Sequence, residues 1–298
     1  MSSNSMKPLL LLTSFLTGVL SLQTMASTDV YLADIKMNKG KTKLANIKNV
    51  SQRMGYDNQP YFAPDGSGLY YTAMFQINGE QAQTDILLYT FGGTTKNISQ
   101  TWTTSEYSPT PYQNGQRLSF IKVEEDGSQR LWSMSVVDSS QSILNTDIKP
   151  VGYHAWGKNQ DLALFVLGEP MTLQTVAAAN QPKGQVVANN IGRSIRYNPK
   201  LDAFSFTHGD NQMLAIHTPT NSQNQDLVPL PNGAEYYTWF DHDTVIAAKG
   251  TKIMQLSYTL YGKGWYEFGD VSEACSTRVT RLAVNQTQTR LAFVCDEE

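Results

Sequence analysis

The sequence predicts an all-β protein, and more specifically a six-bladed β-propeller. A pattern of strand, polar turn and strand returns six times, at intervals of roughly 41 to 49 residues. A period in the forties built from strand pairs is typical of propeller blades of about four strands each. Dividing the roughly 272 residues that follow position 26 by about 45 per blade also gives six.

The repeating unit is defined by its turn and by an aromatic residue before the turn. The six copies occupy 60–72, 111–121, 156–165, 197–206, 239–247 and 282–294. Asp65-Gly66 and Asn114-Gly115 favour a tight reversal because both residue pairs tolerate a positive φ. Large aromatic side chains precede the turn in five copies and supply apolar area where neighbouring sheets pack face to face: Phe62, Tyr112, Trp156, Tyr197 and Trp239.

The two chain ends complement each other. The chain finishes on one strand pair, about 278–284 and 290–295, and two further strands, 29–35 and 42–47, precede the first copy. These N-terminal strands have the character of the third and fourth strands of a blade. We therefore expect the N-terminal strands to pair with the C-terminal strands in one sheet, which closes the ring and removes two exposed edges.

The first copy carries the most distinctive motif of the chain. Phe62-Ala63-Pro64-Asp65-Gly66, followed by Asp85-Ile86-Leu87-Leu88-Tyr89, resembles the Pro-Asp-Gly repeat of TolB-like periplasmic propellers. The second copy, with the strand 129–134, is similar. The resemblance covers the propeller part only, since the α/β domain that precedes the propeller in TolB has no counterpart here. It implies a six-bladed ring that binds an envelope partner at its channel face.

Residues 1–26 have the pattern of a signal peptide. Lys7 gives a positive start, 9–22 form an apolar stretch, and Thr24-Met25-Ala26 forms a cleavage site of small residues. The apolar stretch is about 14 residues, short of the roughly 20 that a spanning helix needs. We expect export to the periplasm as a soluble protein without a membrane span, leaving 27–298 as one propeller domain. An uncleaved anchor is the alternative.

The charge balance argues against one class of partner. With 23 basic and 26 acidic residues and no basic cluster, the chain is a poor candidate for nucleic acid binding.

The two cysteines are expected to form a disulfide. Cys275 and Cys295 both fall in the last copy, and in an oxidising compartment a disulfide between them is expected. Two unpaired buried thiols are the alternative, and the pair by itself offers too few ligands for a metal.

Ring geometry predicts which side chains surround one mouth of the channel. The innermost strand of each blade lines the channel, so the residues at its start gather at one mouth. Aligning the copies gives ten candidate binding residues: Asp57, Asn58, Glu106, Tyr107, Tyr153, His154, Arg193, Glu235, Tyr236 and Arg278. They fit either a solvated channel with mutually satisfied polar groups or a binding site with tyrosines as flat contacts.

Two catalytic alternatives involve the same residues. Asp57, Asn58, Glu106 and Glu235 offer oxygen ligands of the type that calcium prefers. His154 with Glu106 or Glu235 could act as an acid–base pair. The chain lacks a Gly-x-Ser-x-Gly elbow and the His-Glu-x-x-His and Cys-x-x-Cys motifs, so no catalytic residue and no metal or cofactor is assigned.

The sequence therefore favours a non-enzymatic, monomeric binding or scaffold protein of the periplasm. Its expected partner is an envelope protein or peptide, or a glycan. The alternative is a lyase or hydrolase that acts on a sugar or lactone at the channel, with a metal or by acid–base catalysis.

Overall fold

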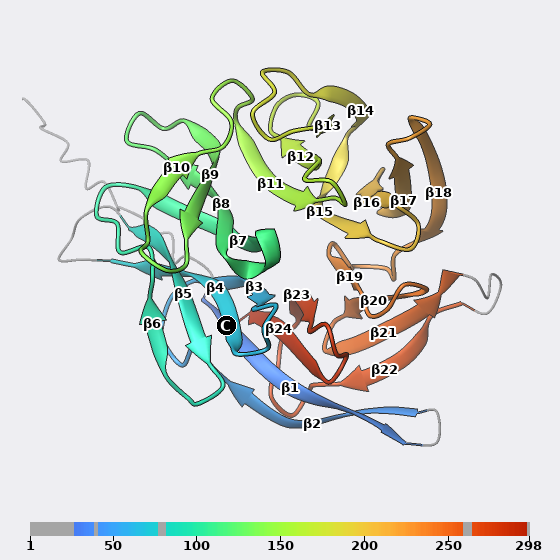
Figure 1. The fold of residues 1–298 in the computed structure, drawn as a ribbon. Coiled ribbons are helices and arrows are strands. Elements are labelled where there is room, and N and C mark those ends of the chain that lie inside the picture. The colour runs from blue at the N-terminus through green and yellow to red at the C-terminus, as the bar shows by residue number, and fades with distance from the viewer. Residues whose placement is uncertain (1–26, 39–40, 77–81, 259–263, 297–298) are drawn as a thin grey trace, which may run out of the picture.

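The computed structural model describes residues 27–38, 41–76, 82–258 and 264–296, and the expected signal peptide lies outside these residues. Six four-stranded antiparallel sheets are arranged as blades around a ring (Figure 1). This confirms the predicted six-bladed β-propeller. Within the described ranges, no helix has the length and apolarity needed to cross a membrane.

Five blades are continuous in sequence, each with its strands in chain order from the channel outward. Blade 1 contains β3 (Asp57–Phe62), β4 (Gly68–Phe75), β5 (Gln83–Thr90) and β6 (Thr95–Asn97). Blade 2 contains β7 (Ser105–Tyr112), the 3₁₀ turn η1 (Gln113–Gly115), β8 (Arg117–Val123), β9 (Gln129–Ser135) and β10 (Gln141–Ile143). Blade 3 contains β11 (Val151–Trp156), β12 (Leu162–Val166), β13 (Thr172–Val176) and β14 (Gln185–Asn189). Blade 4 contains β15 (Ile191–Asn198), β16 (Ala203–His208), β17 (Met213–Thr218) and β18 (Gln223–Pro229). Blade 5 contains β19 (Tyr237–Trp239), β20 (Thr244–Lys249), β21 (Lys252–Ser257) and β22 (Tyr266–Asp270).

The sixth blade, here the closing blade, is assembled from both ends of the chain. Its order from the channel outward is β23 (Val279–Val284), β24 (Arg290–Asp296), β1 (Thr28–Asn38) and β2 (Lys41–Asn49). β1 pairs antiparallel with β24 from Thr28↔Asp296 to Asp34↔Arg290. The N-terminal strands are thus the third and fourth strands of a blade, as predicted, and each chain end covers an edge that the other would expose.

The apolar core lies between the blades. Buried side chains form six clusters, and each cluster combines residues of two neighbouring blades. The cluster between blades 3 and 4, for example, contains Phe165 and Phe206, both fully buried. Since one sheet cannot bury its own faces, every blade depends on its neighbours, which explains the apolar alternation in all six copies.

The innermost strands are irregular. The pairing with the second strand shifts within β3 between Asn58 and Tyr61, and within β7 between Tyr107 and Thr110. Gln59 and Ser108 occupy these shifts with positive φ values of 56° and 57°. β15 and β23 contain similar shifts. A bulge changes which side chains of a strand point to which side, so the sequence pattern alone cannot settle what faces the channel.

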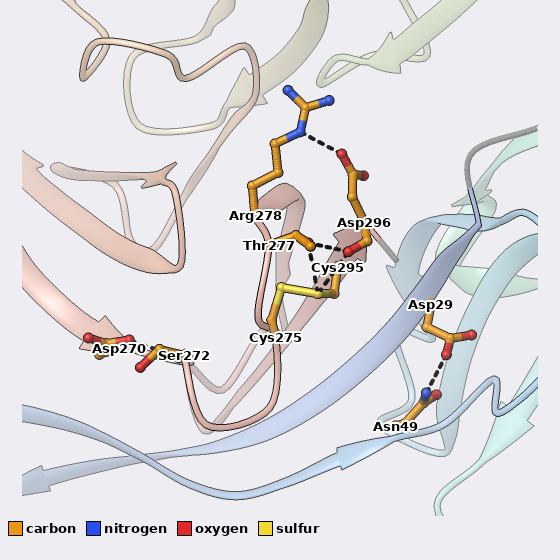
Figure 2. Close-up of a disulfide and its surroundings, with 9 residues drawn as sticks. All are labelled: Asp29, Asn49, Asp270, Ser272, Cys275, Thr277, Arg278, Cys295 and Asp296. Atoms are coloured by element: carbon orange, nitrogen blue, oxygen red, sulfur yellow. Dashed lines mark hydrogen bonds and ion pairs between the residues drawn. A yellow bond between two sulfur atoms is a disulfide. The ribbon is translucent and has the colours of Figure 1, made fainter. Parts of the chain in front are cut away.

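A disulfide joins Cys275 and Cys295, as expected (Figure 2). Cys295 lies opposite Val279 in the sheet, and the segment before β23 folds back so that the two Cα atoms are 5.7 Å apart. Arg278 pairs with Asp296 at 2.5 Å beside the bond, which fixes the last described residue of β24 to the same segment.

Candidate binding site in the propeller channel

Two connected hollows follow the axis of the ring. The wider hollow, of about 810 Å³ and here the bowl, opens on the face where the innermost strands end. The narrower one, of about 210 Å³ and here the inner cavity, lies deeper between the innermost strands of blades 1, 2, 3, 4 and the closing blade. Both hollows share Pro60, Tyr61, Pro111, Arg196 and Tyr197, so the inner cavity is the deep end of the bowl.

Aromatic rings and turn residues surround the bowl. Tyr61 is 40% exposed, and blade 5 contributes Trp239 from the end of β19 and Phe240 from the turn after it. Two carboxylates also line the bowl, but each accepts hydrogen bonds within its own turn: Asp65 from Ser67, and Asp241 from the backbone N–H groups of Asp243 and Thr244. The bowl is therefore a concave surface mainly of aromatic, proline and amide groups, with Arg196 and His242 also in its lining.

Arg281 of β23 lies at the deep end, surrounded by tyrosines. Its guanidinium donates a hydrogen bond of 2.9 Å to the Tyr153 hydroxyl and lies over the rings of Tyr236 at 4.1 Å and Tyr153 at 5.0 Å. Burial raises the pKa of Tyr56, and the positive charge of Arg281 partly offsets that rise. Burial opposes the charge of Arg281 most strongly, but the surrounding tyrosines outweigh this and raise its pKa. The guanidinium of Arg281 is therefore a buried positive charge held among aromatic rings.

Two more arginines of β15 line the inner cavity. Arg196 donates one hydrogen bond of 2.9 Å to the carbonyl of its neighbour Ile195, and burial lowers its pKa. Arg193 is exposed and lies near Tyr236. Among the described residues, no carboxylate lies within ion-pair distance of Arg193, Arg196 or Arg281.

Asp57 and Asn58, predicted at the channel mouth, are buried within the protein. Arg53 donates to both carboxylate oxygens of Asp57, at 2.8 and 3.0 Å. Burial raises the pKa of Asp57 to about 6, and the hydrogen bonds from Arg53 work against that rise. Asn58 contacts Thr28 of the closing blade and the backbone of Gln59. These side chains connect blade 1 to the closing blade.

Glu106 occupies in blade 2 the position that Asp57 occupies in blade 1. Its carboxylate accepts hydrogen bonds from Thr101 at 2.6 Å and Thr104 at 2.7 Å, and Lys122 lies 3.9 Å away. Burial raises its pKa, and the two threonines partly offset that effect. Like Asp57, this carboxylate is fully buried and already bonded on its own blade.

His154 lines the inner cavity and is buried. Its Nε2 lies 2.6 Å from the Ser119 hydroxyl, which also accepts from Trp156 Nε1 and donates to the carbonyl of Thr110. Since that hydroxyl has one proton, all three contacts are satisfied only if His154 Nε2 donates. Burial lowers the pKa of His154 to about 3, so the ring is neutral and Nδ1 is an acceptor. His154 Nδ1 has no partner among the described residues.

The remaining predicted residues lie at the deep mouth. Tyr153 and Tyr236 contact Arg281, and Tyr107 lies near Tyr56 among the same tyrosines. Glu235 and Arg193 are exposed beside Tyr236. Arg278 is nearby but is paired with Asp296. The structure therefore gathers six of the ten predicted residues at this mouth and buries the other four.

The possible calcium ligands do not converge. Within the ranges that the structure describes, no group of three or more His, Cys, Asp or Glu side chains is placed to hold a metal ion. Asp57 and Glu106 are bonded to side chains of their own blades, whereas Glu235 is exposed. These residues do not fit a cation site.

Sequence reasoning missed the two arginines that dominate the channel, Arg196 and Arg281. Both lie next to the register shifts of their strands, Ile191 to Ile195 in β15 and Val279 to Leu282 in β23. The only sequence signal was their position within the predicted innermost strands. The bowl was also missed, because the sequence pattern was aligned at the starts of these strands and the bowl lies at their ends.

Comparisons with known proteins identify the fold. No family model and no curated protein sequence matches the chain. A structure assigned as TolB from Agrobacterium tumefaciens is 10% identical, with a TM-score of 0.69, over 92% of this chain and 99% of that one. One chain of a nidogen–laminin complex is 10% identical, with a TM-score of 0.61, over 90% and 98%. A gluconolactonase from Xanthomonas campestris is 8% identical, with a TM-score of 0.61, over 91% and 97%. At such identities the likeness establishes a TolB-like propeller fold, which hosts both binding proteins and enzymes.

Proposed function

We propose that this chain is an exported, periplasmic binding protein without enzymatic activity, which holds a protein or peptide segment over the bowl. The observation that carries this proposal is the bowl itself. Its volume of about 810 Å³ lies within the usual range of ligand sites, and aromatic rings converge on it from several blades. Aromatic side chains supply large contact area at a low cost in conformational entropy.

The titratable groups support binding over catalysis. A general base must reach the substrate, but Asp57 and Glu106 are fully buried and hydrogen-bonded within their own blades. Among the described residues, the only ion pair of a histidine with a carboxylate joins His208 and Asp226, on β16 and β18 of blade 4. The bowl therefore offers no hydrogen-bonded acid–base pair within the described part of the chain.

The solved structures of similar fold include both a protein in a complex, the nidogen–laminin chain, and an enzyme, the gluconolactonase. The choice between a binding function and an enzymatic one therefore depends on the residues of this chain. The rival proposal, a lyase or hydrolase acting on a sugar or lactone, needs convergent donors that the candidate ligands of this chain do not provide.

Photo-crosslinking in the periplasm tests the proposal. A photoreactive phenylalanine at Tyr61 should give a discrete covalent adduct with a partner that mass spectrometry identifies. The same residue at Val186, which is 51% exposed on the outer strand β14, is the control and should give none. When the purified partner is added back to the two photoreactive proteins, it should crosslink at Tyr61 but not at Val186. Equal labelling at both positions, or turnover of a lactone or acidic sugar by the purified protein, would overturn the proposal.

Export is tested separately, because it rests on residues 1–26. We expect the protein in the periplasmic fraction with Ser27 as its N-terminal residue. Retention in the membrane fraction with Met1 intact would identify an uncleaved anchor instead.

A further inference from the structure

The inner cavity carries positive charge without a compensating carboxylate. Arg193, Arg196 and Arg281 line it, and no Asp or Glu is among its lining residues. Arg196 and Arg281 lie close enough that the charge of Arg281 contributes to lowering the pKa of Arg196. Two guanidinium groups that repel each other in a partly desolvated cavity are stabilised by an anion that both can reach.

Toward the residues that the structure describes, both arginines retain free hydrogen-bond donors. A guanidinium has five N–H donors. Arg196 donates one hydrogen bond, to the carbonyl of Ile195, and Arg281 donates one, to Tyr153. Planar groups of this kind bind a carboxylate through two parallel hydrogen bonds, which makes a carboxylate a suitable ligand.

The unpartnered polar atoms near this cavity are shielded from it. Three buried side-chain polar atoms of the described residues lack a hydrogen-bond partner: Ser108 Oγ, His154 Nδ1 and Thr280 Oγ1. Ser108 and His154 both line the inner cavity, but these two atoms are themselves closed to water. The polar groups that a ligand in the cavity can reach are therefore chiefly those of the arginines.

The position of the inner cavity specifies part of that ligand. The inner cavity is the deep end of the bowl, so a group bound there can be continuous with a chain that leaves through the bowl. The C-terminal residue of a peptide carries the carboxylate that the arginines require, and the preceding residues supply such a chain.

We propose that the inner cavity binds the C-terminal residue of an extended peptide, with its carboxylate on Arg196 and Arg281. The preceding residues of the peptide leave through the bowl. This inference rests on the proposed function and names the chemistry that the site recognises. Arg193, at the exposed end of the cavity, adds long-range attraction for the negative chain end.

The size and lining of the cavity favour a peptide end over an acidic sugar. Its volume of about 210 Å³ is below the roughly 300 Å³ of small-molecule pockets, so it accommodates one residue while the rest lies in the bowl. A sugar ring would bring several hydroxyl donors that need acceptors. The side-chain oxygen of Gln59 is already taken by Thr72 and by the N–H of Ser108. His154 Nδ1 and Ser108 Oγ lack partners but are closed to water, so neither accepts a hydrogen bond from a sugar hydroxyl.

The test compares two peptide pools on the wild-type protein. One is a randomised N-acetylated hexapeptide pool with a free C-terminal carboxylate, and the other is the same pool with a C-terminal amide. Equilibrium dialysis with quantification by mass spectrometry should show binding of the free pool at least about tenfold tighter, since hydrogen bonds to charged groups contribute about 10- to 100-fold in affinity. This comparison needs no variant and so does not depend on altered folding.

Variants test whether the preference for a free C-terminal carboxylate depends on the arginines of the channel. Arg196→Gln and Arg281→Gln should each remove the preference for the free carboxylate. Arg130→Gln removes the same charge from blade 2, where Arg130 pairs with Glu124, and should leave the preference unchanged. Thermal melts confirm that each variant is folded.

Each outcome has a distinct meaning. Equal binding of both pools would overturn the carboxylate site but leave the proposed peptide-binding function standing. Binding of neither pool, together with no crosslinked partner at Tyr61, would overturn both proposals. Arginine-dependent binding of oligogalacturonate or of inorganic phosphate, with no binding of peptides, would overturn the peptide assignment in favour of that anion.

Discussion

The closing blade and blade 3 have the same four-stranded architecture but different connections. In blade 3, three short turns join β11 to β14 within 151–189. In the closing blade, β1 and β24 come from opposite chain ends and are joined by seven antiparallel residue pairs. The disulfide joins only residues that are 20 apart in the sequence. Ring closure is therefore non-covalent, and the integrity of the channel depends on the pairing of the two chain ends.

The two blades also differ at one register position next to the channel. His154 of blade 3 pairs with Leu164, and the matching position of the closing blade holds Leu282, which pairs with Phe293. One blade thus places a buried titratable group where the other has an apolar contact. At this position blade 3 has an imidazole beside the inner cavity, whereas the closing blade has an apolar contact there and contributes Arg281 from the preceding residue.

Deleting 28–49 should have the largest effect. It removes β1 and β2, exposes the edge of β24 and uncovers Phe293 and Leu291. We expect loss of cooperative folding and aggregation, measured by size-exclusion chromatography and thermal melts. As a control, a circular permutant would join residue 296 to residue 28 by a short linker and open the turn at Asn232-Gly233. It keeps all strands and should fold, and a well-folded deletion variant would contradict the importance of the chain ends.

Phe293→Ala and Phe165→Ala compare the two blades by the same substitution. Both side chains are fully buried, so each change should lower the free energy of unfolding by about 3–5 kcal/mol. Denaturant unfolding measures both values. Phe293 stacks on Tyr31 of the N-terminal strand at 5.2 Å, so a loss below about 1 kcal/mol there would show that the chain ends are not tightly packed.

Removing the disulfide by the double change Cys275→Ala and Cys295→Ala should cost about 3 kcal/mol. The crosslink restricts a short loop of the unfolded chain, and loops of this length give a stabilisation of that order. Denaturant unfolding with and without reductant checks the value. Reductant should have no further effect on the double variant. Two reactive thiols in the untreated protein would contradict the bond itself.

Acid should destabilise blade 3 through His154. Its pKa is about 3 in the folded protein and about 6.5 when unfolded, so the unfolded state binds more protons between these values. The free energy of unfolding should therefore fall as the pH drops below about 6.5, by about 2 kcal/mol at pH 5. His154→Gln should remove this component, whereas Leu282→Val in the closing blade should leave the pH profile unchanged. Identical pH profiles of wild type and His154→Gln would contradict the buried neutral state.

The predicted and missed site residues differ in a consistent way. Tyr153 and Tyr236 were placed at the channel because a residue at the start of an innermost strand must lie at one mouth of the ring. Asp57 and Glu106 follow the same rule by sequence, yet each precedes a bulge, at Gln59 and at Ser108, and is fully buried. A shift of one residue exchanges the two sides of a strand, and no local pattern in these segments indicates that shift.

The sequence by itself determined the number of blades, the closure by the two chain ends and the pairing of Cys275 with Cys295. These features follow from apolar alternation, turn chemistry and spacing, which act over a few residues or repeat along the chain. Only the tertiary structure decided that Arg196 and Arg281 line one cavity, that His154 is buried beside it, and that the wider mouth is where the strands end. Such convergence depends on register shifts in several separate strands, because each shift determines a side chain's direction only once the neighbouring blades have packed.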